Sequence, residues 1–222
     1  MLKYIEEKTP KPDNMVIFLH GYGSNRFDLF ELRDDLRSEG KNTYFVSLEA
    51  PRRCENFSNG FQWFSLKHMP FPIQNISALT REAAESVIGD VEESSRQLTE
   101  FICEKAENAK VPYDKIFLMG FSQGATVSVY ASLRMGKRLG GVISCSGVLI
   151  DGEKFFSGGD FAKQKILFFY GLRDDRIDKK NFACAATTLK KYLGSDADIV
   201  EYGDLSHSID SREIEKIRTF IR

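Results

Sequence analysis

The chain has 222 residues and a formal net charge of −1, so it lacks the basic excess that a nucleic-acid-binding surface requires. This length suits a single domain, residues 1–222, with one large core. No stretch reaches the apolar length of a membrane span, which argues against stable membrane insertion, and the N-terminal residues lack the apolar run of a secretory signal.

The cysteine pattern argues for a reducing environment. The four cysteines, Cys54, Cys103, Cys145 and Cys184, do not have metal-site spacing. A chain of this length also needs no disulfides for stability. We therefore expect a cytoplasmic protein in which each cysteine is a small buried apolar residue.

The first half of the chain is predicted to contain three strands, two helices and one irregular segment. Strands are expected at 3–7, 15–19 and 43–48, and helices at 28–38 and 79–108. The run 15–19 is entirely apolar, which is typical of a strand covered on both faces. Gly89 weakens the prediction that the long helix is continuous. Residues 54–76 have no clear period and are rich in aromatic side chains, and an irregular segment of that length is usually functional.

The second half continues the alternation of strands and helices. Strands are expected at 115–119, 141–147, 165–171 and 197–202, and helices at 125–133, 179–193 and 210–222. An insertion of low regularity is expected at 148–163. Repeated alternation of this kind predicts an α/β protein with a mostly parallel central sheet and helices on both faces.

The most informative motif is Gly120-Phe121-Ser122-Gln123-Gly124, which joins a predicted strand to a predicted helix. In that context the pattern indicates a nucleophile elbow, a sharp turn that holds a serine hydroxyl at the carboxyl end of a parallel sheet. The first helix amides place partial positive charge where an oxyanion would form. The alternative is a glycine-rich turn without chemistry.

A nucleophilic serine needs a base, and the base needs a carboxylate to fix its tautomer. In hydrolases with this elbow the acid follows the serine and the histidine follows the acid, and among the three histidines only His207 satisfies that order. We interpret His20 as structural and assign His68 no chemistry. The alternative for His207 is a surface loop residue without a catalytic role.

The acid is expected in the loop after the strand that ends at Gly171. Asp174 and Asp175 are adjacent there, and the pattern does not choose between them. Asp178 is better interpreted as the N-cap of the next helix. The oxyanion would be held by two backbone amides, that of Gln123 in the elbow and that of Tyr22 in the glycine-rich loop after the first central strand.

These motifs resemble the phospholipase/carboxylesterase family of α/β-hydrolases, the group that includes acyl-protein thioesterases. The resemblance rests on residues 19–23, 120–125 and 203–207 and on the spacing Gly171-x-x-Asp174-x-x-Ile177, and it spans nearly the whole chain. Residues 62–66, Gln-Trp-Phe-Ser-Leu, look like the bacterial carboxylesterase branch. The chain departs from the family pattern at Tyr170, often His, and at Asp175, often Pro.

The resemblance implies an α/β-hydrolase fold and cleavage of carboxylic esters or thioesters of acyl chains, with (lyso)phospholipid among the substrate classes. It implies no metal and no cofactor, and the sequence has no H-E-x-x-H or similar ligand spacing. It places the nucleophile on Ser122, the base on His207, the acid on Asp174 and the oxyanion donors on the amides of Tyr22 and Gln123. The substrate would be a small-molecule ester or an acylated molecule.

The irregular segment 54–76 admits two interpretations. Its aromatic and apolar side chains could line an acyl-binding groove near the active site, with Trp63, Phe64, Met69 and Phe71 as the substrate-binding candidates. They could instead fill core beneath a long loop. An exposed part of the segment would offer a surface for membrane docking or for pairing two subunits into a homodimer. The competing function for the whole chain is a non-catalytic, hydrolase-like protein that binds an acyl ligand.

Overall fold

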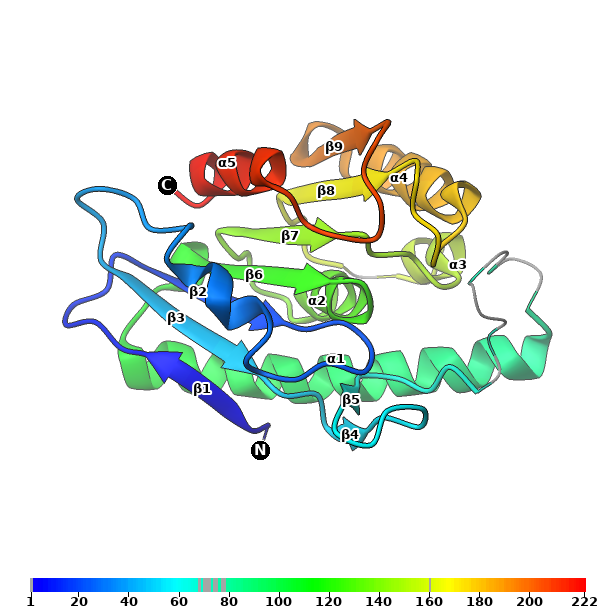
Figure 1. The fold of residues 1–222 in the computed structure, drawn as a ribbon, viewed down its shortest axis with the longest axis horizontal. Coiled ribbons are helices and arrows are strands. Elements are labelled where there is room, and N and C mark those ends of the chain that lie inside the picture. The colour runs from blue at the N-terminus through cyan, green and yellow to red at the C-terminus, as the bar shows by residue number, and fades with distance from the viewer. Residues whose placement is uncertain (1, 68, 70–72, 74–75, 77–78, 160) are drawn as a thin grey trace.

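The computed structural model describes residues 2–67, 69, 73, 76, 79–159 and 161–222. Within these residues the chain forms a seven-stranded sheet in the order β1-β3-β2-β6-β7-β8-β9 (Figure 1). Edge strand β1 (Tyr4–Glu7) is antiparallel to β3 (Thr43–Leu48). The remaining pairs are parallel and are formed by β2 (Asn14–Leu19), β6 (Ile116–Phe121), β7 (Gly141–Cys145), β8 (Ile166–Gly171) and β9 (Ala197–Tyr202).

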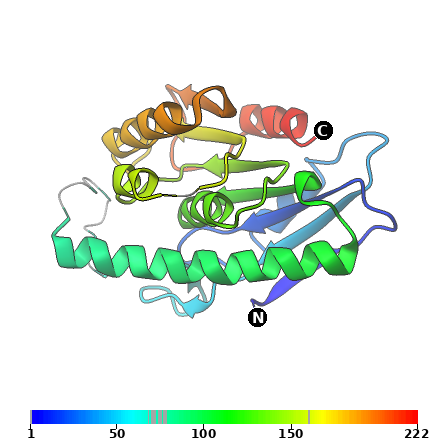
Figure 2. The ribbon, with the colours of Figure 1, turned by 180° about the vertical axis from the view of Figure 1, so that it is seen from behind.

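Helices cover both faces of this sheet. Figures 1 and 2 show four of them on one side: α1 (Arg81–Ala109), α2 (Gln123–Arg134), α3 (Gly152–Ser157) and α4 (Lys179–Leu193). The opposite face is covered by α5 (Ser211–Phe220) and by the 3-10 helix η1 (Leu29–Arg33). The predicted class, a mostly parallel sheet with helices on both faces, is therefore confirmed.

Alternation of side chains along the central strands divides the core into two layers. In β2, Met15, Ile17 and Leu19 join the cluster beneath α1 and α2, whereas Val16 and Phe18 join the cluster beneath α5. Successive residues of a strand point to opposite faces, so a strand buried on both sides must be apolar throughout. That requirement explains the continuous apolar run in the sequence.

Helix α1 runs unbroken through Gly89. Its N-cap Thr80 accepts a hydrogen bond from the amide of Ala83, and Lys110 closes it in the left-handed conformation. Gly89 is exposed, with no atom within 4 Å of where a Cβ would lie, so its lower helix propensity is not offset by packing. The helix survives because a buried stripe that includes Val87, Val91 and Leu98 anchors it to the core.

The predicted helix at 28–38 is wrong. The structure has only the short 3-10 helix η1, followed by hydrogen-bonded turns. The side chain of Arg33 donates to the carbonyl of Phe30, the group that an α-helix would use to bind the amide of Asp34. With Leu29 and Leu36 as the buried anchors, the segment gains too little from packing to offset helix nucleation.

The two irregular segments contain short elements that the sequence pattern did not reveal. Helix α3 lies within 148–163, and β5 (Phe61–Gln62) within 54–76 pairs with β4 (Arg52–Arg53). Both elements are too short to show a period. In the described part of the chain, none of the helices has the combined length and apolar character needed to cross a membrane.

Candidate active site

Ser122 lies at the turn between β6 and α2 in a strained backbone conformation. Its φ is +54° and its ψ is −114°, a region that residues with a Cβ rarely adopt. The turn is held by the amide of Ser122, which donates to the carbonyl of Cys145 on the neighbouring strand at 2.9 Å. This is the geometry of a nucleophile elbow, and it puts Ser122 at the N-terminus of α2.

The two glycines of the motif are required by close backbone approach. A Cβ on Gly124 would lie 2.1 Å from the carbonyl oxygen of Leu19, and one on Gly120 would lie 2.4 Å from the amide nitrogen of Ala125. The first helical turn of α2 therefore packs directly against the end of β2. The small residues let the elbow and the loop after β2 share one site.

We predict opposite effects for alanine at two helical glycines. Gly124→Ala should destabilise the fold by several kcal/mol, about 3 or more, because neither backbone segment can move away without disrupting the sheet. Gly89→Ala should stabilise it by about 0.5–1 kcal/mol, because the site is open and alanine favours helix. Denaturant unfolding measures both, and a neutral effect at Gly124 would contradict the close approach.

His207 and Asp174 meet across two loops. Nδ1 of His207 lies 2.6 Å from Oδ2 of Asp174, whose side chain is 1% exposed. The other oxygen, Oδ1, accepts hydrogen bonds from the amides of Arg176 and Ile177, both at 2.9 Å. Asp175 instead points to solvent, with its side chain 74% exposed beside Arg176. The structure thus brings Asp174, and not its neighbour, to the imidazole.

The imidazole lies beside the elbow. The ring of Phe121, the residue before Ser122, has its centroid 4.8 Å from that of His207. Among the residues that the structure describes, the hydroxyl of Ser122 makes no hydrogen bond to His207. Such bonds are often long in unliganded enzymes and tighten when the substrate binds.

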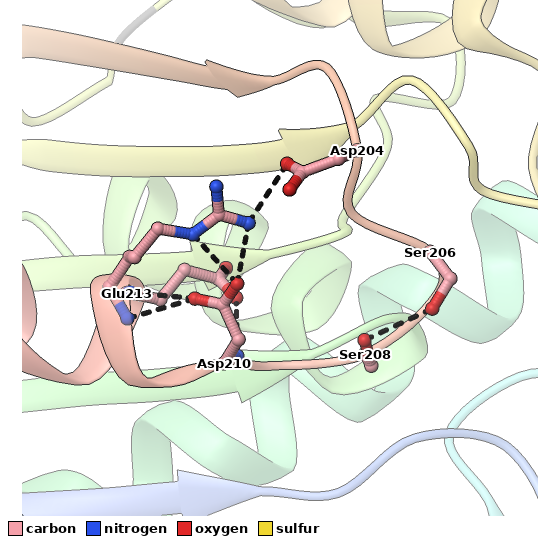
Figure 3. A network of polar contacts seen from close by, with 6 residues as sticks. Asp204, Ser206, Ser208, Asp210 and Glu213 are labelled. Carbon is pink, nitrogen blue, oxygen red and sulfur yellow. Dashed lines mark hydrogen bonds and ion pairs between the residues drawn. The ribbon is translucent and has the colours of Figure 1, made fainter.

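The loop that carries His207 is tied down at both ends. On one side the amide of Arg173 donates to the carbonyl of Leu205 at 3.0 Å, which joins this loop to the Asp174 loop. On the other side Asp210 caps α5, and its own amide donates to Glu213 (Figure 3). Burial raises the pKa of Glu213 to about 7. His207 is therefore held between two ordered segments.

Surface contacts add to this support. The guanidinium of Arg212 donates to Asp204 at 2.9 Å and to Asp210 at 2.6 Å, which bridges the two ends of the loop. The hydroxyls of Ser206 and Ser208 lie 3.2 Å apart, on either side of His207 in the chain (Figure 3). These contacts limit the conformations that the loop can adopt.

The amides of Tyr22 and Gln123 have no hydrogen-bond acceptor among the described residues. The neighbouring amide of Gly23, in contrast, donates to the carbonyl of Phe61 at 2.9 Å. Tyr22 follows the end of β2 and Gln123 begins α2, and the close approach at Gly124 puts these two segments together. Two free amides beside Ser122 are the donors that an oxyanion requires.

The side chain of Gln123 connects the elbow to the 54–76 segment. Its Oε1 accepts from the amide of Trp63 at 3.0 Å, and its Nε2 donates to the carbonyl of Phe64 at 2.8 Å. Gln123 is 4% exposed, so these bonds form away from water. The motif marks Gln123 by its backbone amide alone, and no local pattern indicates the partners of its side chain.

We predict that Gln123→Leu destabilises the protein by about 2–4 kcal/mol. Leucine has a similar volume but leaves the Trp63 amide and the Phe64 carbonyl buried without partners. The matched variant Gln97→Leu removes one part-buried hydrogen bond to Glu93 and should cost less than about 1 kcal/mol. Thermal or denaturant unfolding compares the two variants. Equal losses of stability would argue that the hydrogen bonds from Gln123 to Trp63 and Phe64 do not stabilise the fold.

His20 is structural, as the sequence analysis interpreted it. The residue is fully buried, its Nε2 accepts from the amide of Ala50 at 3.1 Å, and its Nδ1 lies 2.7 Å from the carbonyl oxygen of Gly21. Burial lowers the pKa of His20, so the ring is neutral and carries its proton on Nδ1. Its own carbonyl accepts from the indole of Trp63 at 2.9 Å.

Three of the proposed substrate-binding side chains, Trp63, Phe64 and Met69, lie in the core. Trp63 is 0% exposed, Phe64 2% and Met69 6%, and all three belong to the cluster beneath α1 and α2. Their burial fits the interpretation that they fill core, and contact with a substrate would require them to become exposed. That contact stays a prediction. Phe71 and His68 lie outside the described residues.

The remaining sequence predictions on this chain concern cysteines and metals. Cys54 and Cys145 are buried and Cys103 is half-buried, but Cys184 is exposed, so the expectation of four buried cysteines is wrong. Cys184 lies on the solvent side of α4, between the buried Phe182 and Ala185. No group of three or more potential metal ligands occurs in the part of the chain that the structure describes.

Comparisons with known proteins agree with the fold and the motifs. A model of the family described as phospholipase/carboxylesterase matches residues 2–222. Acyl-protein thioesterase 1 homolog 1 of Dictyostelium discoideum is 25% identical and the match covers 98% of this chain and 93% of that protein.

Two solved structures share the fold. Esterase PE8 superposes with a TM-score of 0.83 at 24% identity, over 99% of this chain and 96% of that one. SOBER1 of Arabidopsis thaliana gives 0.80 at 21% identity, over 94% and 97%. Because the family model spans nearly every residue, the chain belongs to the phospholipase/carboxylesterase family of α/β-hydrolases.

Proposed function

We propose that Ser122, His207 and Asp174 form a catalytic triad that cleaves carboxylic esters or thioesters through an acyl-enzyme on Ser122. Members of this family are serine hydrolases that act on esters and thioesters, which gives the reaction class. The observation that carries the assignment is the buried Asp174 carboxylate 2.6 Å from His207. The His207 ring in turn lies 4.8 Å from that of Phe121, the residue before the strained Ser122.

In the proposed acylation step, Nε2 of His207 takes the proton from the Ser122 hydroxyl as its oxygen attacks the acyl carbonyl carbon. Asp174 holds the proton on Nδ1 and stabilises the imidazolium. The amides of Tyr22 and Gln123 donate to the oxyanion of the tetrahedral intermediate. His207 then protonates the departing oxygen or sulfur, and the acyl group remains as an ester on Ser122.

In the proposed deacylation step, His207 activates a water molecule. The hydroxide equivalent attacks the acyl-enzyme carbonyl, the same two amides bind the second oxyanion, and Ser122 recovers its proton from the imidazolium. The products are a carboxylic acid and free enzyme. Each proton moves between Ser122, His207, the leaving group and water, so the residues of this chain are sufficient for the reaction.

The substrate class within this reaction is a proposal drawn from the relatives. The Dictyostelium discoideum relative is named an acyl-protein thioesterase, and the family description adds phospholipase and carboxylesterase. We propose that the substrate is an acyl ester or thioester whose leaving group is either a small molecule or part of a protein. Lysophospholipids are a further proposed class of substrate. The cytoplasmic location and the homodimer stay predictions.

A fluorophosphonate probe tests the proposed nucleophile. It should label the folded protein at one serine, and the label should be lost in Ser122→Ala and kept in Ser128→Ala, whose buried hydroxyl only donates to the carbonyl of Gly124. Peptide mapping by mass spectrometry identifies the site. Folded protein that takes no label and cleaves no ester would favour the alternative of a non-catalytic acyl-ligand binding protein.

A further inference from the structure

A cavity of about 300 Å³ opens beside His207 on the side of the sheet covered by η1. It lies between the start of η1 and the loop that carries the proposed base. Its lining comprises Asp28, Leu29, Glu31, Leu32, Phe121, His207, Ser208 and Ile209. Phe121 precedes the proposed nucleophile in the chain, so this cavity borders the proposed reaction centre.

The reaction fixes what such a cavity would hold. In acyl transfer the histidine that deprotonates the serine must next protonate the leaving oxygen or sulfur. The leaving group therefore departs on the side of the imidazole. A cavity lined by His207 is thus placed for the leaving group, and at about 300 Å³ it suits a small one.

The charged side chains in the lining of the cavity are negative. Asp28 and Glu31 are exposed carboxylates, and among the described residues no lysine or arginine lines the cavity. Asp28 accepts only the hydroxyl of Ser24 at 2.7 Å, and neither carboxylate has an ion-pair partner among the described residues. The nearest basic residues in the sequence are already paired, Arg26 with Glu49 and Arg33 with Glu7 at 3.0 Å.

The rest of the lining is apolar. Leu29 is buried, Leu32 and Ile209 pack against the same cluster, and Phe121 contributes an aromatic ring. A cation that carries alkyl groups matches this combination, because carboxylates attract the charge while apolar and aromatic surfaces contact the carbons. A leaving group whose only charge is a phosphate would meet two like charges.

We propose that this cavity is a leaving-group subsite that favours a cationic, alkyl-bearing leaving group, with Asp28 and Glu31 as the specificity-determining residues. The proposal rests on the proposed function, since it takes His207 as the base. It concerns the group released in acylation and not the acyl chain. Substrates that differ only in the charge of that group therefore isolate it.

The test compares three esters of one acyl chain: the choline ester, its uncharged 3,3-dimethylbutyl isostere, and the ester formed with the hydroxyl of 2-hydroxyethyl phosphate. The wild-type kcat/KM should be highest for the choline ester, about three- to tenfold above the isostere, and lowest for the phosphate ester.

Asp28→Asn and Glu31→Gln should each lower the choline-to-isostere ratio of kcat/KM about two- to fivefold, and the double variant should bring it near one. Raising the salt concentration to about 0.5 M should reduce the wild-type ratio, because screening weakens exposed charge pairs.

The matched control is Asp35→Asn. Asp35 is an exposed carboxylate shortly beyond η1 that does not line the cavity, so its loss changes net charge equally and should leave the ratio unchanged. Fluorophosphonate labelling of each variant reports on the fold of the site. A ratio that stays the same in the double variant, with the isostere still cleaved, overturns the subsite alone. If the wild type cleaves none of the esters, the proposed function fails and the subsite fails with it.

Discussion

Replacing Ser122 with alanine is expected to lower kcat for ester cleavage by about 10⁵-fold or more. The change removes the atom that attacks the carbonyl, and the nearby hydroxyl of Thr126 is directed at the backbone carbonyls of Ser122 and Val148. The residual activity of the variant would come from the oxyanion donors and from substrate binding. His207→Ala should cause a loss of the same order, because a serine hydroxyl without a base is a poor nucleophile near neutral pH.

The double variant Ser122→Ala/His207→Ala tests whether the two losses of activity have one common cause. If Ser122 and His207 act as one unit, removing both should cost little more than removing either, since their effects are not additive. Ser122→Ala should change the free energy of unfolding by less than about 1 kcal/mol, because its hydroxyl makes no hydrogen bond among the described residues. His207→Ala should cost more, about 1–3 kcal/mol, because it removes the side-chain partner of the buried Asp174 carboxylate, but the protein should stay folded. Full activity in a folded Ser122→Ala variant would end the triad assignment.

The second large effect concerns the acid. Asp174→Asn should lower kcat by about 10³- to 10⁴-fold, while Asp175→Asn should change it by less than about twofold. The carboxylate of Asp174 accepts from His207 and from two backbone amides, and it is almost fully buried. Asp175 lies in solvent beside Arg176, where the loss of a charge costs little.

The asparagine variant has a specific defect. Its Oδ1 can still accept from the two amides, which leaves its NH₂ group facing Nδ1 of His207. The ring would then keep its proton on Nε2, where it cannot accept the proton of Ser122. Steady-state kinetics of the two variants, with circular dichroism as a folding control, checks the ranking. A larger loss for Asp175→Asn would move the acid by one position.

Most of the framework was predictable from local patterns. The apolar runs of the central strands, the helix at Lys179–Leu193 and its N-cap Asp178, which accepts from the amide of Lys180, follow rules that act within a few residues. The elbow is local for the same reason, since a strand, a glycine-flanked serine and a helix are consecutive in the chain. Family membership followed from these motifs and their order, and the match over residues 2–222 confirms it.

Local patterns failed where side-chain hydrogen bonds and contacts distant in the sequence outweighed propensity. Residues 28–38 have the apolar spacing of a helix, but the side chain of Arg33 takes the Phe30 carbonyl and the segment forms only a 3-10 turn. Trp63 and Phe64 follow no period that distinguishes a groove wall from core. Their burial depends on Gln123, which is 60 and 59 positions away in the sequence.

The sequence by itself determined the α/β class, the strands of the main sheet, the helices α1, α2, α4 and α5, and the Ser122 elbow, because each is determined by neighbouring residues. The residue pattern left Asp174 and Asp175 open, and the family resemblance favoured Asp174; the tertiary structure shows that Asp174 meets His207, 33 positions away. Only the tertiary structure revealed that Asp28 and Glu31 share a cavity with that histidine. The reason is that parallel strands bring their carboxyl ends to one edge of the sheet. Which side chains meet there depends on how the loops fold back on one another, and no periodic pattern records that.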